Sequence, residues 1–145
     1  MNQESESAVR GLIDSARVGV LATVGSDGYP HTRWMTAVTL PGEKDFVYCV
    51  SMAGSRKAAD IAFSDRVAWS FQAPDLSRVA TIAGRAAIIE TPELKARVLE
   101  ALGRDLETFW RVNPDPSRLV VIETLIESAA LYRPNAAAPD TEESL

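Results

Sequence analysis

Apolar residues recur with two different periods along the first part of this chain. Over residues 7–16 they recur at helical spacing, which predicts an amphipathic helix. Two segments of turn composition follow, Gly25-Ser26-Asp27-Gly28 and residues 41–45. Alternating, valine-rich runs around these turns predict three strands, over residues 17–24, 31–40 and 46–51. The pattern therefore predicts a helix followed by a meander of hairpins.

Helical and extended patterns continue in the second part of the chain. Residues 58–63 predict a short helix that opens at Ser55, whose hydroxyl can cap it. Thr91-Pro92 predicts the start of a longer helix, which carries an apolar stripe and runs to Trp110. Gly84 lies within a long β-prone run, where we expect a bulge or bend. The remaining strands are predicted at residues 66–73, 78–90, 119–122 and 129–132.

This order of elements indicates a mainly β fold with flanking helices. About six antiparallel strands suggest a closed or partly closed barrel. Regular alternation of strands and helices is missing, which argues against a doubly wound parallel sheet. Residues 134–145 have no apolar period. We therefore expect one domain over residues 1–133 and a disordered acidic tail over residues 134–145.

Length and composition exclude several classes of protein. The chain of 145 residues fits a single domain, and it contains no apolar run of the ~18 residues that a membrane helix needs. Its first residues are polar and acidic, unlike a secretory signal, so we expect a cytoplasmic protein without a membrane partner. One cysteine, Cys49, and one histidine, His31, exclude an internal disulfide and a Cys/His zinc cluster, and no metal is expected.

The charge of the chain is unevenly distributed. A net charge of −5 argues against a general nucleic-acid binder, so no nucleic-acid partner is expected. Between Gly28 and Ile89, however, seven basic residues face five acidic ones, which gives this stretch a net +2 and leaves −7 for the rest. A mildly basic centre in an acidic chain suits a small phosphorylated ligand better than a polyanion. Scattered surface charge would give the same tally.

Familiar catalytic motifs are missing from the sequence. Neither glycine-rich phosphate loop occurs, and neither the G-x-S-x-G elbow nor the H-E-x-x-H zinc helix is present. A Ser-His-Asp triad would have to use His31 as its base, and the alternative is a hydrogen-bonded structural histidine. The motifs therefore leave binding, rather than acid–base catalysis, as the better supported chemistry.

Cationic and hydroxyl groups gather at two places in the predicted fold. Arg33 lies on the second predicted strand, and Ser51 ends the third. Ser55-Arg56-Lys57 opens the short helix, whose first backbone N–H groups carry a partial positive charge. Together these groups could bind a phosphate, with Arg33 closing the site as a bidentate fork. The alternative is that all three cations are ordinary solvated side chains.

Three sequence motifs, in order, resemble a known superfamily. LATVGSDGYPHTRWM (residues 21–35) is similar to the opening hairpin of the pyridoxamine 5′-phosphate oxidase-like FMN-binding split-barrel superfamily. SMAGSRKAADIAFSDRVAWSF (residues 51–71) resembles its hydroxyl, S-R-K, helix and strand segment, and RVATIAGRAAII (residues 78–89) its next long strand. The similarity covers roughly residues 8–132. Within it, the segments after Pro92 look most like the general stress protein branch.

The resemblance implies a split β-barrel, a cofactor and a set of residues that hold it. FMN is the implied cofactor; a deazaflavin is the alternative, and the Arg33 motif and the short chain favour FMN. Arg33 and Lys57 would contact the phosphate, with hydroxyl and cationic neighbours close by. The flavin would lie at a homodimer interface, where the second subunit supplies further contacts. The implied cofactor-binding residues are Arg33, Trp34, Met35, Thr36, Val50, Ser51, Ser55, Arg56 and Lys57.

Departures from the oxidase pattern narrow the implied activity. Arg78 and Val79 stand where the oxidase has a flavin-contacting glutamine, and the chain ends without a basic, tryptophan-containing substrate motif. Oxidation of pyridoxamine phosphate is therefore not expected, whereas flavin binding is. We expect an FMN-dependent oxidoreductase acting on an unknown small molecule. The alternatives are a non-catalytic flavin-binding stress protein that acts as carrier, scavenger or sensor, and a split barrel that has lost its cofactor.

Overall fold

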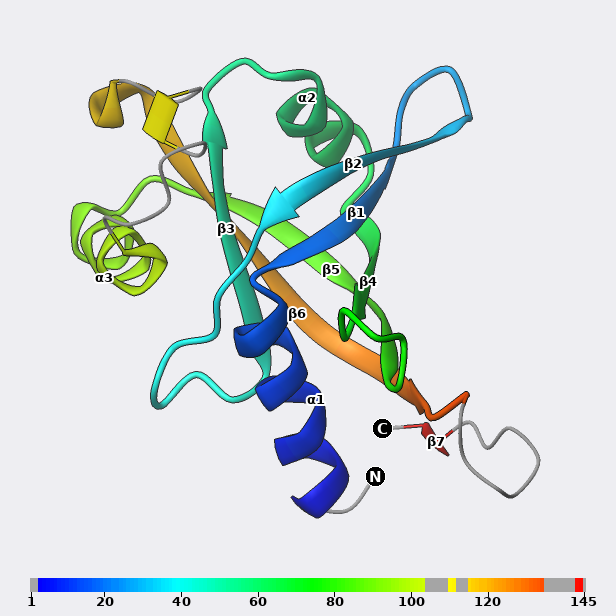
Figure 1. The fold of residues 1–145 in the computed structure, drawn as a ribbon. Coiled ribbons are helices and arrows are strands. Elements are labelled where there is room, and N and C mark those ends of the chain that lie inside the picture. The colour runs from blue at the N-terminus through cyan, green and yellow to red at the C-terminus, as the bar shows by residue number, and fades with distance from the viewer. Residues whose placement is uncertain (1–2, 104–109, 112–114, 135–142, 145) are drawn as a thin grey trace.

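The structure is a computed structural model that describes residues 3–103, 110–111, 115–134 and 143–144. Its elements confirm a mainly β fold with flanking helices (Figure 1). In chain order they are α1 (Gln3–Ala16), β1 (Val18–Val24), β2 (Pro30–Thr36), β3 (Phe46–Met52), α2 (Arg56–Phe63), β4 (Arg66–Gln72), β5 (Val79–Ile89), α3 (Pro92–Leu102), η1 (Pro116–Arg118), β6 (Leu119–Tyr132) and β7 (Glu143–Ser144).

The strands form one curled antiparallel sheet. Among the described residues they pair in the order β2-β1-β4-β5-β6-β3, and β7 pairs with β6 off this path. The curl brings the two edge strands, β2 and β3, toward each other (Figure 1). At one end a bridge joins Val38 to Tyr48 through two backbone hydrogen bonds of 2.9 and 2.8 Å. The expected split barrel of antiparallel strands is therefore confirmed.

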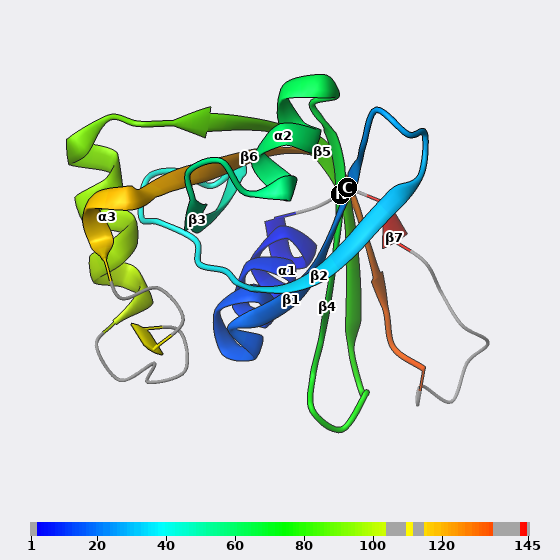
Figure 2. The same ribbon diagram turned by 90° about the horizontal axis from the view of Figure 1, so that it is seen from above.

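α2 follows β3 directly in the chain and lies close to β1. From above, α2 lies over the region where β2 and β3 diverge (Figure 2). Ser55 caps this helix as expected, because its Oγ accepts a hydrogen bond of 3.3 Å from the Ala58 N–H. The capped N-terminus of α2 therefore lies next to the end of β3.

Two hydrophobic clusters fill the fold. The larger packs the buried face of α1 against the sheet, where the rings of Trp69 and Phe71 stack with centroids 5.3 Å apart. Trp69 Nε1 also donates a hydrogen bond of 3.1 Å to Thr124 Oγ1, so its polar atom is satisfied in the interior. The smaller cluster packs α3 against β3 and the start of β6, with Tyr48, Val98 and Leu102 at its centre. Both clusters use residues of β6.

Several local expectations need correction. α1 begins at Gln3 rather than at residue 7. β2 ends at Thr36, and of residues 37–40 only Val38 pairs further, through its bridge. Thr91 precedes α3 as expected but makes no side-chain cap bond. α3 ends at Leu102, because Gly103 takes a positive φ of 83° that leaves the helix; most of the predicted extension to Trp110 lies outside the described residues.

The C-terminal region also differs from expectation. The two short strands predicted there are one continuous strand, β6, because β5 pairs along it from Val121 to Tyr132 and β3 pairs with its first half. The register of β5 against β6 shifts between Ala83 and Gly84, which confirms the expected bulge. Of the tail, residues 135–142 and 145 lie outside the described residues, and β7 pairs with Ala130 and Leu131. No described helix is long and apolar enough to span a membrane.

Candidate functional site

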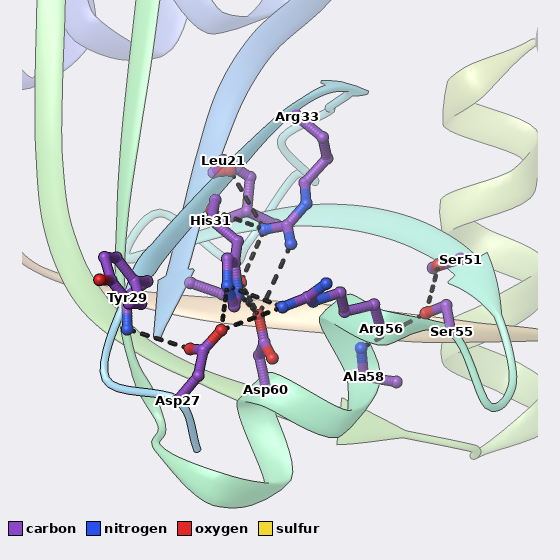
Figure 3. A network of polar contacts seen from close by, with 11 residues as sticks. Leu21, Asp27, Tyr29, His31, Arg33, Ser51, Ser55, Arg56, Ala58 and Asp60 are labelled. Atoms are coloured by element: carbon purple, nitrogen blue, oxygen red, sulfur yellow. Dashed lines mark hydrogen bonds and ion pairs between the residues drawn. The ribbon is translucent and has the colours of Figure 1, made fainter. Parts of the chain in front are cut away.

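Alternation along β2 sorts the predicted site residues between two faces of the sheet. Arg33 is partly buried on the inner face, together with His31 and Met35. Trp34 points the other way and is 81% exposed. Its side chain is therefore free for an external contact, whereas the Arg33 side chain points toward Asp60 of α2 (Figure 3).

Two serine hydroxyls meet at the end of β3. Ser51 is only 3% exposed, and its Oγ lies 3.1 Å from the Oγ of Ser55. Since Ser55 Oγ also accepts from the Ala58 N–H, this hydroxyl pair joins the edge strand to the first turn of α2. Val50, the neighbour of Ser51, is 2% exposed and belongs to the smaller hydrophobic cluster. Its side chain is therefore part of the core.

Arg33 is held from one side by acceptors of the β1–β2 hairpin. Its Nη1 donates to Thr23 Oγ1 at 2.7 Å, to the His31 carbonyl at 3.1 Å and to the Leu21 carbonyl at 3.2 Å. Its Nη2 lies 3.7 Å from Asp60 Oδ2. Burial lowers the pKa of the Arg33 guanidinium, and the charge of Asp60 opposes that shift. The guanidinium thus has a fixed position, while its Nε makes no hydrogen bond within the described part of the chain.

Asp60 of α2 receives polar groups from both strands of the hairpin. It is 5% exposed, and its Oδ2 accepts from Thr23 Oγ1 at 2.7 Å and contacts His31 Nδ1 at 2.8 Å. Burial alone would raise the pKa of this carboxyl. Hydrogen bonds from His31 and Thr23, and then the charges of His31 and Arg33, outweigh burial and bring the pKa of Asp60 below its ordinary value.

Lys57 differs from its cationic neighbours because its charge has no counter-ion in the described part of the chain. Its side chain is partly buried, yet no hydrogen bond or ion pair reaches its ammonium from the residues that the structure describes. Burial lowers the pKa of Lys57, and the charge of Arg33 lowers it further. Lys57 and Arg33 also act electrostatically on the buried thiol of Cys49, whose pKa burial raises to about 12. Two cations thus lie near each other with one of them unpaired.

Arg56 extends from α2 to the turn of the β1–β2 hairpin (Figure 3). Its Nη2 lies 3.2 Å from Asp27 Oδ2 and 2.9 Å from His31 Nε2. His31 Nε2 is in turn 3.1 Å from the same Asp27 oxygen. A backbone hydrogen bond from Tyr29 is the largest effect on Asp27, and together with His31 and Arg56 it lowers the pKa of this carboxyl against the opposing effect of burial. We call the group formed by Thr23, Asp27, His31, Arg33, Arg56 and Asp60 the hairpin–helix network.

Sequence reasoning found the cations and serines of this region but missed their carboxylate partners. Asp60 follows Arg56 by one helical turn, and the hairpin register places Thr23 opposite His31. These spacings are the signals that could have indicated the hairpin–helix network. His31 contacts Asp60, Asp27 and Arg56 through its ring nitrogens and contacts no serine within the described residues. It is therefore the hydrogen-bonded histidine of the two alternatives, and not the base of a serine triad.

The chemistry of this region suits an anion. In the described part of the chain, no group of three or more histidine, cysteine or acidic side chains could hold a metal ion. By contrast, Lys57 offers beside Arg33 an ammonium that no described residue pairs, and the Ser51–Ser55 pair lies at the N-terminus of α2. Charge-assisted donors of this kind match the oxygens of a phosphate group. The residues present therefore fit a phosphorylated ligand.

Comparisons with known proteins agree with the fold. A family model described as pyridoxamine 5′-phosphate oxidase matches residues 5–131. No curated protein sequence matches the chain. General stress protein 26 from Bacillus anthracis has a similar structure, with a TM-score of 0.75 at 21% identity, and the alignment covers 99% of this chain and 98% of that one.

Two further solved structures share the fold. A protein from Clostridium acetobutylicum, described as related to general stress protein 26 and to the pyridoxinephosphate oxidase family, has a TM-score of 0.74 at 14% identity, covering 100% of this chain and 96% of that one. A heme binding protein from Mycobacterium smegmatis has a TM-score of 0.74 at 20% identity, covering 100% of this chain and 59% of that one. At these identities the likeness concerns the fold alone.

Proposed function

Since this chain belongs to the pyridoxamine 5′-phosphate oxidase family, we propose that it is a flavoprotein that binds FMN non-covalently and serves as an oxidoreductase of a small molecule. One observation carries the proposal. Lys57 is a partly buried cation beside Arg33, at the capped N-terminus of α2, and no counter-ion reaches it from the residues that the structure describes. Burying a charge without a partner is costly, so a ligand of opposite charge would stabilise this arrangement.

The proposed roles divide the residues between the two ends of the cofactor. Arg33 and Lys57 would hold the phosphate, with the Ser51 and Ser55 hydroxyls and Arg56 close to it. The backbone of residues 34–36 and of Val50 would lie along the ribityl chain and ring. A bound flavin supplies hydride or electron transfer. The chain itself then has to bind and orient the cofactor and control access to it, which fits the lack of a recognised acid–base motif.

A flavin-binding stress protein without turnover and a heme protein are the two alternatives to this function. A flavin-binding stress protein without turnover would use the same phosphate contacts. Because both nitrogens of His31 are engaged by Asp60, Asp27 and Arg56, no imidazole among the described residues is free to act on a substrate, and this observation favours the non-catalytic alternative. The same engagement argues against heme, for which histidine is a common axial ligand. Anaerobic addition of NADH or NADPH, followed by flavin absorbance, separates an enzyme from a binder.

Removal of the proposed phosphate contacts tests the proposal directly. Charge-assisted hydrogen bonds contribute ~1.5–3 kcal/mol each, so Lys57→Met and Arg33→Ala should each weaken FMN binding roughly ten- to a hundredfold. Arg33→Lys should restore only part of the affinity, because the fork geometry is lost. Riboflavin, which has no phosphate, should bind the parent weakly and respond little to any of these changes. Titration by flavin fluorescence quenching measures all of them.

Lys57→Met and Arg33→Ala differ in how many contacts within the fold each one removes. Arg33→Ala also removes three hydrogen bonds within the fold, whereas Lys57→Met leaves the aliphatic stem in place and breaks no bond between described residues. Lys57→Met is therefore the decisive variant, and thermal unfolding should be followed beside it. Lys95→Ala, on α3 and outside the proposed site, should leave affinity unchanged. Equal binding of FMN and riboflavin to the parent would refute the phosphate site.

A further inference from the structure

His31 is the only histidine of the chain, and it lies between the hairpin turn and α2 (Figure 3). Its Nδ1 contacts Asp60 Oδ2 at 2.8 Å. Its Nε2 has two partners at once: Arg56 Nη2 at 2.9 Å and Asp27 Oδ2 at 3.1 Å. A ring nitrogen either donates or accepts in a given protonation state, so these contacts determine what the imidazole can do.

In the neutral imidazole the partners define one tautomer. An arginine guanidinium can only donate, so the contact with Arg56 requires that Nε2 accept. The single ring proton then lies on Nδ1, where it is donated to the ionised carboxylate of Asp60. Neutral His31 therefore holds Arg56 through Nε2. Through Nδ1 it contacts Asp60, whose carboxylate also faces Arg33.

In the protonated imidazolium, Nε2 carries a hydrogen and the arrangement changes. The Nε2–H can donate to Asp27 Oδ2, but Arg56 and Nε2 are now two donors facing each other, and both groups are positive. Arg56 consequently loses one acceptor and keeps only its ion pair with Asp27. The two contacts of Nε2 thus belong to different protonation states, and gain of a proton loosens Arg56 from the hairpin.

The imidazole of His31 has little room to rotate away from these partners. Gly25 is buried directly against it, and a Cβ at this position would lie 2.6 Å from His31 Cε1 and 2.9 Å from Asp60 Oδ1. Such close packing keeps the imidazole edge aligned with Asp60 on one side and with Arg56 and Asp27 on the other. The orientation of His31 is therefore imposed by the turn, and a proton can alter its partners without moving the ring.

The charges around His31 show what the proton changes. The groups that face the ring or its partners are Asp27 from the hairpin turn, Arg33 from β2, and Arg56 and Asp60 from α2. Two arginines and two carboxylates cancel, so only Lys57 leaves the region with a net +1 when His31 is neutral. Protonation of His31 raises this to +2, which matches the ≈ −1.5 to −2 of a phosphate group at neutral pH.

We propose that His31 is a proton-linked positioning residue of the FMN phosphate site: gain of a proton on Nε2 strengthens phosphate binding by adding a positive charge and by breaking the His31–Arg56 contact, which leaves Arg56 held to the hairpin through Asp27 alone. This proposal rests on the proposed function. It predicts that FMN binds more tightly as His31 becomes protonated. By linkage, FMN must favour protonated His31 to the same extent.

The first test compares FMN dissociation constants at pH 6 and pH 8 in the parent and in His31→Asn. Asparagine can still donate to Asp60, but it does not titrate. The phosphate of FMN itself gains a proton near pH 6, and this effect is equal for both proteins, so the ratio of parent to variant isolates His31. We expect affinity of the parent to rise relative to the variant by roughly three- to tenfold between pH 8 and pH 6. Lys95→Ala should behave as the parent.

The second test follows the single imidazole by ¹⁵N NMR. Without ligand, neutral His31 should show the Nδ1–H tautomer, and Arg56→Gln should shift the Nε2 signal. Addition of FMN should move the midpoint of the imidazole titration to higher pH, by the same factor that separates the binding curves. Riboflavin should leave the midpoint in place. A purely structural histidine would lower stability when replaced but would leave the two binding profiles parallel.

The outcomes separate this proposal from the proposed function. If FMN binds but the pH profiles of parent and His31→Asn coincide, the positioning role of His31 is refuted and the flavin site stands. An Nε2–H tautomer of neutral His31 in the ligand-free protein also refutes the positioning role, because Nε2 could then not accept a hydrogen bond from Arg56. If FMN fails to bind the parent at either pH, the proposed function fails, and this proposal fails with it.

Discussion

Asp60 shows how one carboxylate can organise the polar side of a hairpin. It is buried, accepts from Thr23 and His31, and faces Arg33. We expect Asp60→Asn to lower the free energy of unfolding at pH 7 by about 1.5–3 kcal/mol, the contribution of a hydrogen bond to a charged group. The asparagine keeps the shape of the side chain, so the loss reports mainly on the charge.

The pH dependence of this loss has a definite sign. The pKa of Asp60 in the folded protein lies below its ordinary value of 3.8, so its stabilising effect is complete above that value and disappears as the pH falls through the folded pKa. The difference between parent and variant should therefore be largest at pH 7 and shrink toward pH 2 in denaturant unfolding. Asp65→Asn, whose side chain is half exposed, is the matched control and should change stability little. A difference independent of pH would contradict the assignment.

Single residues also mark the limit of prediction from sequence. The cations and the capping serine were predictable, because Ser55-Arg56-Lys57 is a local signal of a helix start. Asp60 was missed, because its one-turn spacing from Arg56 gains meaning only with the register of a hairpin that lies far from it in the chain. Whether Arg33 and Lys57 bind a phosphate stays a prediction. Local patterns identify groups that could act, whereas tertiary packing determines which of them face each other.

At the scale of elements, Gly84 allows β5 to bend along β6. A Cβ at this position would overlap the carbonyl oxygen of Leu125, which is backbone and cannot turn aside. We therefore expect Gly84→Ala to lower the free energy of unfolding by about 1–3 kcal/mol or more. Urea unfolding followed by circular dichroism measures the change.

A second glycine supplies the control for this substitution. Gly11 lies in α1 with open space around it, so Gly11→Ala should be neutral or should stabilise the protein by up to about 1 kcal/mol, through the helix propensity of alanine. If both substitutions change stability equally, loss of glycine flexibility rather than overlap with Leu125 would be the cause.

Elements were predicted best where their signals are local. The strands around the Asp-Gly turn, the cap of α2 and the bulge at Gly84 agree with expectation. The continuity of β6 was missed because its middle, near Glu127 and Ser128, is polar and exposed. β5 pairs across this middle and β3 pairs only with its first half, so the strand is defined by its neighbours. The hydrophobic pattern of a strand does not show which other strands will pair with it.

At the scale of the whole molecule, an apolar strip on the outer face of the β1–β2 edge predicts self-association. Trp34 is 81% exposed and pairs with Val20, and the adjacent Val18 is 46% exposed. Together with the homodimer that the family resemblance implies, this predicts sedimentation near twice 15.7 kDa at micromolar concentration. Trp34→Ser should shift the equilibrium toward the monomer. Leu76→Ser, on the β4–β5 turn, should not. A monomer that still binds FMN stoichiometrically would contradict an interface site.

The position of β3 in the sheet has a consequence for the nascent chain. β3 comes early in the sequence, but among the described strands its ladder partner is β6, with Phe46 opposite Leu125 and Met52 opposite Leu119. While the ribosome is still making the later strands, β3 and Ser51 near its end lack this ladder partner, and only the bridge from Val38 to Tyr48 can form. Closing so long a loop costs entropy before any contact repays it, which makes such pairings slow. The end of the barrel that carries Ser51 and α2 is thus completed last, and until then the apolar residues of β3 are a natural target for chaperones.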